Sequence, residues 1–315
     1  MEERITAISH MSPVVIFAFN RPDHLERCLE SLRNNKESEH TDFWVFVDGP
    51  RNSDDLLKKE MIKKLLNKYE KLMKLKVKYS ESNLGLEKSV INGLKEIFLL
   101  SECAIIMEDD LVASTFFLEY CNAGLNRYKF DSRVASIHGF SYKFKQPEKQ
   151  PYFLKGADCW GWATWRDRWE YFEDDSVKLI YQLLDKQLKK KFDLDGAFPY
   201  FKMLVRQSRG EVNSWAIRWH ASMFLADKLT LYPDRTLINN NGMDGSGTNA
   251  GKSKSLNSPL AITSINLSGV QVKESSKVRR KLKVFLRNHY SIRYKASPIR
   301  LIFAAKRRLS KLYFG

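Results

Sequence analysis

Short apolar runs alternate with amphipathic segments through the first third of the chain. Continuous apolar runs of strand length cover residues 14–19, 43–47 and 103–107, and an alternating run covers 75–79. Between these runs, apolar residues recur at the spacing of one buried helix face. The resulting β-α-β-α-β-α-β order predicts an α/β fold with a mostly parallel sheet and helices on both faces.

The remaining pattern is less regular and shows no internal repeat. Ser114 can cap a helix that runs to Tyr128, and residues 152–170 form an aromatic, glycine-bearing stretch. The other predicted elements are strands at 133–138, 229–232 and 237–238, helices near 176–191, 197–209 and 215–226, and a loop at 239–251.

Polar residues follow all four predicted strands of the first third of the chain. They are Asn20 and Arg21, Asp48, Asn83, and the adjacent acids Glu108, Asp109 and Asp110. Ligands of such folds bind at the carboxyl ends of the strands, so these residues predict a site at one sheet edge. Three neighbouring carboxylates repel one another unless a cation lies nearby, and hard oxygen ligands suit Mg²⁺ or Mn²⁺ carrying a diphosphate. The alternative is an acidic turn that begins the next helix.

The charge distribution separates a body from a basic tail. The chain has 315 residues and a net charge of +16, yet fourteen Lys and Arg against one acid, Glu274, lie from Lys273 onward. The near-neutral body argues against a nucleic-acid-binding protein. We expect one domain over residues 1–270 and a basic helical extension over 271–315.

Within the extension, apolar and basic residues separate on a helix after Pro298. Ile299, Ile302, Ala305, Leu309 and Leu312 fall on one side, and Lys306, Arg307, Arg308 and Lys311 on the other. This pattern is typical of a segment that lies on an anionic membrane surface, with an ordinary helix packed on the body as the alternative.

Targeting signals and cysteine usage point to the cytoplasm. Residues 1–11 are polar, the apolar run at 14–19 is too short for a signal peptide, and no run approaches the roughly 18 apolar residues of a membrane span. The four cysteines show no Cys-x-x-Cys pair, as expected of reduced thiols. We expect a cytoplasmic protein that is peripheral at the inner face of the cell membrane.

The ordered motifs resemble the GT-A glycosyltransferases, among them N-acetylglucosaminyltransferase I and related bacterial sugar transferases. The resemblance covers roughly residues 13–250. It is carried by Pro13–Phe19 with Asn20-Arg21-Pro22, Asp48, Met107-Glu108-Asp109-Asp110-Leu111 with Phe116-Phe117, Gly161-Trp162, and the Trp-rich helix start at 215–219.

The resemblance implies a nucleotide-sugar donor, usually UDP-linked, and Mn²⁺ or Mg²⁺. Asp110 would ligate the metal, while Glu108 and Asp109 would hold ribose or the waters of the metal. Asp48 would face the base, with Asn20 and Asn83 at the same edge. Arg21 and Lys88 would contact phosphate through charge-assisted hydrogen bonds.

The sequence differs from the family pattern at the general base of an inverting enzyme. The family places a carboxylate near the Trp-rich helix start, where residues 215–219 contain no acid. Glu211 is the first candidate, Asp158 the second, and Asp244 lies in the later loop. Trp160 and Trp162 either stack on sugar rings or pack in the core. His138 is equally open to a site or a packing role, whereas packing is favoured for His220.

Together these features predict a metal-dependent, inverting glycosyltransferase acting on a glycan or lipid-linked glycan hydroxyl. The setting implied by the resemblance is bacterial surface polysaccharide or lipopolysaccharide assembly. A sugar nucleotidyltransferase is one alternative, but it opens with a glycine-rich loop, which Asn20-Arg21-Pro22-Asp23 is not. A non-catalytic basic module that binds membrane or nucleic acid is the other.

Overall fold

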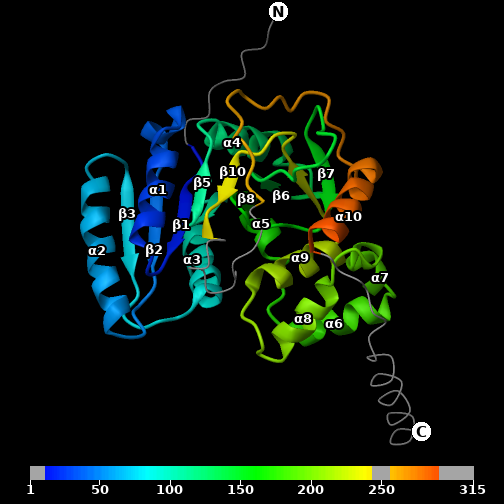
Figure 1. Ribbon diagram of the computed structural model, residues 1–315, viewed down its shortest axis with the longest axis horizontal. Helices are drawn as coiled ribbons and strands as arrows, with labels where there is room; N and C mark the ends of the chain where they lie inside the picture. Colours follow the sequence, from blue (N-terminus) through cyan, green and yellow to red (C-terminus); the bar gives the residue numbers. More distant parts are fainter. Residues whose placement is uncertain (1–10, 243–255, 291–315) are drawn as a thin grey trace, which may run out of the picture.

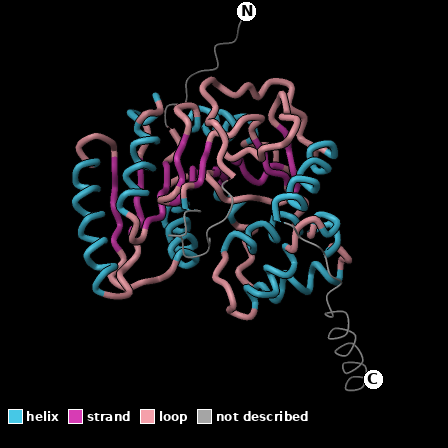
Figure 2. The backbone as a smooth tube through the Cα atoms, viewed as in Figure 1, coloured by secondary structure: helices cyan, strands magenta, loops and turns pink. Residues whose placement is uncertain are grey.

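The computed structural model describes residues 11–242 and 256–290 of the chain. Its strands run as a band through the middle of the molecule, with helices around them (Figures 1 and 2). Asp244 and the predicted amphipathic helix after Pro298 lie outside the described residues.

The first part of the chain follows the predicted alternation. Val14–Ala18 is buried throughout as a central strand, and Pro22 and Asp23 begin the helix that follows, where a fixed φ and a negative charge are favourable. The elements are β1 Val14–Ala18, α1 Pro22–Arg33, the 3-10 helix η1 Lys36–His40, β2 Phe43–Val47, α2 Ser53–Tyr69, β3 Leu75–Tyr79, α3 Leu86–Leu100 and β4 Cys103–Glu108.

The second part is more irregular. The helix predicted from Ser114 begins at Phe117 instead, and the Ser114 hydroxyl accepts a hydrogen bond from Phe116 N at 3.1 Å. The elements are β5 Leu111–Ala113, α4 Phe117–Tyr128, β6 Val134–His138, β7 Tyr152–Lys155, β8 Trp162–Trp165, α5 Arg166–Trp169, α6 Ser176–Asp185, α7 Lys189–Phe192, the 3-10 helix η2 Leu194–Gly196, α8 Tyr200–Ser208, α9 Trp215–Leu225, β9 Leu229–Tyr232, β10 Ile238–Asn240 and α10 Ser276–Tyr290.

The main sheet has the strand order β3-β2-β1-β4-β8-β6-β9-β7. Its first four strands are parallel, as are β6 and β9, whereas β8 pairs antiparallel with both β4 and β6, and β7 with β9. The carboxyl ends of β1, β2, β3 and β4 therefore meet at one edge of the sheet, as the sequence predicts.

A separate two-stranded sheet was not predicted from the sequence. β5 follows the acids of β4 directly and pairs antiparallel with β10, with Leu111 opposite Asn240. This pairing brings Asn241, which follows β10, to the acidic end of β4.

Helix α10 packs on the body. Val278, Leu282 and Leu286 of α10 are buried together with Phe144, Tyr152 and Tyr232. In Figure 1, α10 and α2 lie at opposite ends of the molecule. A domain boundary at residue 270 stays a prediction.

None of the helices in the described ranges combines the length and the apolar character needed to cross a bilayer.

Candidate active site

Three carboxylates lie at the carboxyl end of β4, near the centre of the sheet. Asp109 N continues the ladder by donating to Phe17 O at 3.0 Å, which places Asp109 and Asp110 beside the end of β1. Arg21, the residue before α1, pairs with Asp109 and also reaches Asp110 Oδ2 at 3.0 Å. We call Glu108, Asp109, Asp110 and Arg21 the acidic edge.

The acidic edge carries more negative charge than Arg21 offsets. Burial raises the pKa of Glu108 to about 8, and the nearby Asp110 and Asp109 add to that shift. Burial also raises the pKa of Asp109 to about 6, against the lowering effect of Arg21. A further cation at this position would favour the ionised form of both groups.

The geometry of Asp110 fits a divalent metal. Asp110 is 8 % exposed, and its Oδ1 is buried without a hydrogen-bond partner in the described ranges. A buried carboxylate oxygen without a donor is costly unless a ligand pairs with it. Carboxylate oxygen is a hard ligand of the kind that Mn²⁺ and Mg²⁺ prefer.

No group of three His, Cys, Asp or Glu side chains within residues 11–242 and 256–290 is arranged to enclose a metal ion. An ion held by Asp110 would thus take most of its ligands from diphosphate and water, as Mg²⁺ commonly does.

The segment after β10 closes over Asp110. Asn241 N donates to Asp110 O at 2.9 Å, and a Cβ on Gly242 would lie only 2.1 Å from Asp110 Oδ2. A larger residue at position 242 would therefore displace the Asp110 carboxylate. These two residues were missed as site residues, although the run Asn239-Asn240-Asn241-Gly242 reads as a turn.

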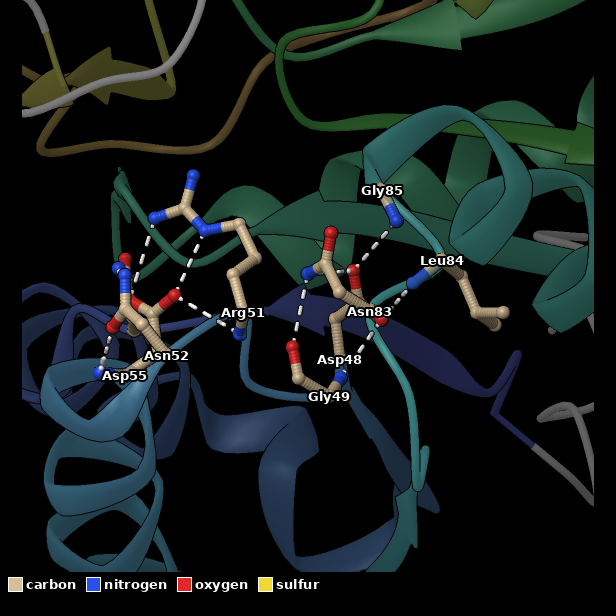
Figure 3. A network of polar contacts seen from close by, with 9 residues as sticks. Asp48, Gly49, Arg51, Asn52, Asp55, Asn83, Leu84 and Gly85 are labelled. Carbon is tan, nitrogen blue, oxygen red and sulfur yellow. Dashed lines mark hydrogen bonds and ion pairs between the residues drawn. The ribbon is translucent and has the colours of Figure 1, made fainter.

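Asp48 is fully used in joining two turns (Figure 3). It accepts hydrogen bonds from Leu84 N, Gly85 N and Gly49 N, each at 2.8 Å, and from Asn83 Nδ2 at 3.0 Å. A carboxylate has about four acceptor sites, so none is left for a hydrogen bond from the base of the nucleotide. The expectation that the Asp48 side chain binds the nucleotide is thereby corrected. Asn83 is exposed, and its contact with the nucleotide stays a prediction.

Asn20 is also engaged within the chain. Its Nδ2 donates to Asp55 Oδ1 at 2.6 Å, and Asp55 binds Arg51 Nε at 2.8 Å (Figure 3). Hydrogen bonding to Arg51 leads the effects that lower the pKa of Asp55 to about 2. Lys88 lies exposed in the first turn of α3, with no ion pair to any described residue, and remains free to reach a phosphate.

Asp158 lines a cavity together with residues of α9 and the segments that flank β6 and β8. Its Oδ2 accepts hydrogen bonds from Tyr142 and Tyr232, both at 2.8 Å, and no described residue donates to Oδ1. The cavity has a volume of about 230 Å³, and Asp158 is its one carboxylate among the described residues. We call it the aromatic cavity; its walls include His138, Phe140, Tyr142, Trp160, Tyr200 and His220.

Cys159 lines the aromatic cavity next to Asp158. Burial raises the pKa of its thiol, and Glu108, Asp158 and Asp110 all add to the shift through their charge. A single side chain thus lies within electrostatic range of carboxylates from both places. The tyrosine partners of Asp158 come from separate segments, and no pattern in the sequence indicated them.

The two histidines of the aromatic cavity differ in their contacts. His138 Nε2 accepts a hydrogen bond from Trp160 N at 3.1 Å, and burial lowers the pKa of His138 to about 4. His220 stacks on Tyr200 with ring centroids 4.5 Å apart, and Gly156, at φ 88°, lets the chain pass close to it. Both rings are neutral at neutral pH, because burial also lowers the pKa of His220.

The tryptophans at 160 and 162 occupy different environments. Trp160 is half-buried, with its ring edge on Phe140 at a centroid distance of 5.0 Å. Trp162 is 0 % exposed and packs against Trp219 at 5.4 Å and Trp215 at 5.7 Å. The expectation that Trp162 stacks on a sugar is corrected, since neither ring face is open.

Glu211 lies on the turn after α8 and forms ion pairs with two nearby arginines. Its carboxylate pairs with Arg206 Nε at 3.2 Å and Arg209 Nη1 at 3.6 Å, and the side chain is 45 % exposed. No contact joins it to the acidic edge or to the aromatic cavity among the described residues.

Comparisons with known proteins define the family. The glycosyl transferase family 2 model matches residues 14–204, and a comparison with curated proteins finds no match. The fold is similar to S. aureus TarS (residues 1–349; 19 % identity, 44 % of this chain and 42 % of that one, TM-score 0.33). It is also similar to the mannosyltransferase PcManGT from Pyrobaculum calidifontis in complex with GDP-Man and Mn²⁺ (12 % identity, 41 % of this chain and 35 % of that one, TM-score 0.31). A third similar structure is GalNAc-T7 with UDP, GalNAc and Mn²⁺ (13 % identity, 53 % of this chain and 37 % of that one, TM-score 0.40).

The chain spans less than half of the length of each of these three structures. The family match itself covers more than half of this chain, including strands β1 to β4 and the acidic edge. With its GT-A type α/β sheet, the chain belongs to glycosyl transferase family 2.

Proposed function

We propose that the chain transfers a sugar from a nucleotide-diphosphate donor, UDP-linked, to the hydroxyl of a glycan or lipid-linked glycan. One observation carries the proposal: Asp110 holds a buried carboxylate oxygen without a partner at the strand edge of a family 2 domain. Such an oxygen fits the divalent metal that accompanies a diphosphate leaving group.

Asp110 Oδ1 is the proposed metal ligand, and Glu108 and Asp109 are the proposed partners of metal-bound water or ribose. When bound, Mn²⁺ or Mg²⁺ supplies positive charge to the departing diphosphate. Arg21 stands beside both aspartates and is placed to add a charge-assisted contact to phosphate, and the exposed Lys88 is a second candidate for that contact.

Asp158 is the better candidate for the general base. Its Oδ1 accepts no hydrogen bond from a described residue, while two tyrosine hydroxyls hold its Oδ2 and so orient the carboxylate. A base must reach the proton that it removes, and Asp158 faces a cavity large enough to admit part of an acceptor. Glu211, the first candidate from sequence, is paired with Arg206 instead.

The aromatic cavity is the proposed acceptor site. Flat aromatic faces suit the apolar faces of sugar rings, and Trp160 is the half-buried ring that is placed to provide one. In an inverting reaction, Asp158 would take the proton of the acceptor hydroxyl as that oxygen attacks the donor sugar from the side opposite the diphosphate.

The finer assignments rest on the resemblance of the motif order to that of N-acetylglucosaminyltransferase I and related bacterial enzymes. We propose hexosyl or N-acetylhexosaminyl transfer in bacterial surface polysaccharide or lipopolysaccharide assembly. The proposed location is the cytoplasm, with the basic extension from residue 271 at the inner face of the cell membrane.

A thermal-shift panel tests the proposal. Nucleotides and nucleotide sugars are added with and without Mn²⁺ to the wild type and to the Asp110→Asn variant. A ligand at 100 times its Kd stabilises the folded state by about 2.7 kcal/mol, so a nucleotide that needs the metal raises the melting temperature of the wild type only. If no nucleotide shifts the wild type, or if Asp110→Asn responds equally, the proposal fails.

A further inference from the structure

A basic groove lies between α10 and the loop before β7, away from the acidic edge. Its volume is about 580 Å³, and it contains no acidic side chain among the described residues that line it. We call it the basic groove; its lining includes Lys143, Phe144, Lys145, Arg280, Val284 and Phe285.

The local fold explains why the cations face outward. In the extended loop, Phe144 is buried against α10, so Lys143 and Lys145 on either side of it are exposed. On α10, the buried stripe of Val278, Leu282 and Leu286 turns Arg280 to the opposite face of the helix.

Four other cations of α10 are neutralised, whereas Arg287 donates only to the backbone oxygen of Asp195 at 3.5 Å and does not line the basic groove. Glu148 binds Lys277 at 3.1 Å and also binds Lys281, while Asp195 binds Arg279 and Lys283, each at 2.9 Å. By contrast, Lys143, Lys145 and Arg280 form no ion pair with any residue of the described ranges. Three exposed charges therefore lie around one groove without compensation.

An apolar side chain lies among these charges. Val284, one turn after Arg280 on the same face of α10, is 56 % exposed, and the ring of Phe285 lies beside it in the groove. Cations mixed with exposed apolar groups are the composition that binds at the boundary between lipid headgroups and acyl chains. Single-stranded nucleic acid would instead favour aromatic faces interleaved with the cations.

We propose that the basic groove docks the folded domain on an anionic phospholipid bilayer. Charge complementarity supports this occupant, because Lys143, Lys145 and Arg280 face a leaflet that carries negative headgroups. The chain continues from the end of α10 into residues 291–315, whose sequence contains seven Lys and Arg and no Asp or Glu. The proposal goes beyond the transfer reaction and does not depend on it, since docking needs neither donor nor metal.

The experiment is co-sedimentation of the full chain with two kinds of vesicle. One contains phosphatidylcholine alone, and the other contains phosphatidylcholine with phosphatidylglycerol. We expect binding to the anionic vesicles only, weakened by salt. The variant K143Q/K145Q/R280Q should bind the anionic vesicles about 10²-fold more weakly, because each basic residue contributes a similar share of the attraction.

The matched control is K58Q/K63Q/K64Q, which removes three exposed lysines of α2 at the far end of the molecule and should bind like the wild type. Both triple variants should keep the wild-type melting temperature, since the replaced side chains are exposed. Val284→Ser should weaken vesicle binding several-fold and leave RNA binding unchanged.

The proposal is overturned if the groove variant binds anionic vesicles like the wild type, or if phosphatidylcholine vesicles bind equally well. It is also overturned if the groove variant loses affinity for single-stranded RNA but not for vesicles. Because the tail is present in every variant, a loss of binding is assigned to the groove.

Discussion

The acidic edge and the aromatic cavity hold their carboxylates in opposite ways. At the acidic edge, one arginine pairs with two of three neighbouring carboxylates, and Asp110 keeps a buried oxygen without a donor among the described residues. In the aromatic cavity, one carboxylate, Asp158, is held by two tyrosine hydroxyls. The first arrangement is incomplete without a cation, whereas the second is oriented through Oδ2 and leaves Oδ1 without a donor among the described residues.

This difference separates two kinds of chemical task. A site that lacks positive charge gains stability from a metal and an anionic ligand, which is what a nucleotide-diphosphate donor brings. A site with one oriented carboxylate among aromatic rings is suited to a neutral hydroxyl-bearing ligand and to moving its proton. The following changes test the division.

The largest effect is expected at the acidic edge. Asp110→Asn should lower the rate of sugar transfer by about 10⁴-fold, because losing a metal ligand removes several kcal/mol of stabilisation from the leaving diphosphate. Initial rates at varied Mn²⁺ measure this. Asp185→Asn, at the exposed end of α6, is the matched control and should behave like the wild type. An Asp110→Asn variant with wild-type rates would rule out metal binding at Asp110.

Substitutions of Trp160 and Trp162 distinguish a ring that lines the aromatic cavity from a ring in the core. Trp162→Ala should lower the free energy of unfolding by about 3–5 kcal/mol, because it removes a fully buried ring from between Trp215 and Trp219. Trp160→Ala should cost less stability and instead raise KM for the acceptor. Urea unfolding and acceptor titrations measure the two variants side by side. Equal effects on both quantities would remove the distinction between the two rings.

The general base gives the next largest effect. Asp158→Asn should lower kcat by about 10²-fold, the lower end of what a general base contributes. Metal-dependent nucleotide binding should persist, since the acidic edge is intact. Glu211→Gln is the matched comparison and should retain activity. If Glu211→Gln is the inactive variant, the assignment from the structure is reversed.

The smallest expected effect is a pH-dependent change in stability at α10, the helix whose Leu286 lines the aromatic cavity. Hydrogen bonds from Lys283 and then Arg279 lower the pKa of Asp195 from 3.8 to about 2. A lowered pKa means that the folded state prefers the ionised form, so this stabilisation is present above pH 4 and is lost as the pH falls towards 2.

We expect that loss to be less than about 1 kcal/mol, because the three side chains are partly exposed. Unfolding free energies on either side of the window measure it. Asp195→Asn should remove this part of the pH dependence without changing nucleotide binding at the acidic edge. An unchanged pH dependence would show that the two ion pairs do not form in solution.

The parallel half of the fold could be predicted from the sequence, because its pattern is local. Four apolar runs with helical spacing between them define β1 to β4, and parallel pairing brings their polar ends together. The antiparallel half could not be predicted in this way. Trp162–Trp165 forms β8 between β4 and β6, yet its residues read only as an aromatic stretch, since strand order depends on contacts distant in sequence.

The same limit applies to the candidate site. A carboxylate that ends a strand looks alike whether it binds a ligand or a turn, and only the contacts with Leu84 and Gly85 reveal that Asp48 is used internally. Similarly, the role of Trp162 depends on α9, which lies about fifty residues further along the chain. Residue type and local spacing identify candidates, while packing decides among them.

The pairing of β5 with β10 has a consequence for the order in which the protein matures. Leu111 and Asn240 lie about 130 residues apart, and Asn241 and Gly242 cover Asp110 only after β10 has joined β5. A chain emerging from the ribosome carries all three acids long before it carries their cover. We therefore expect metal affinity to develop late in folding, so that a nascent chain ending before β10 should not yet retain the ion.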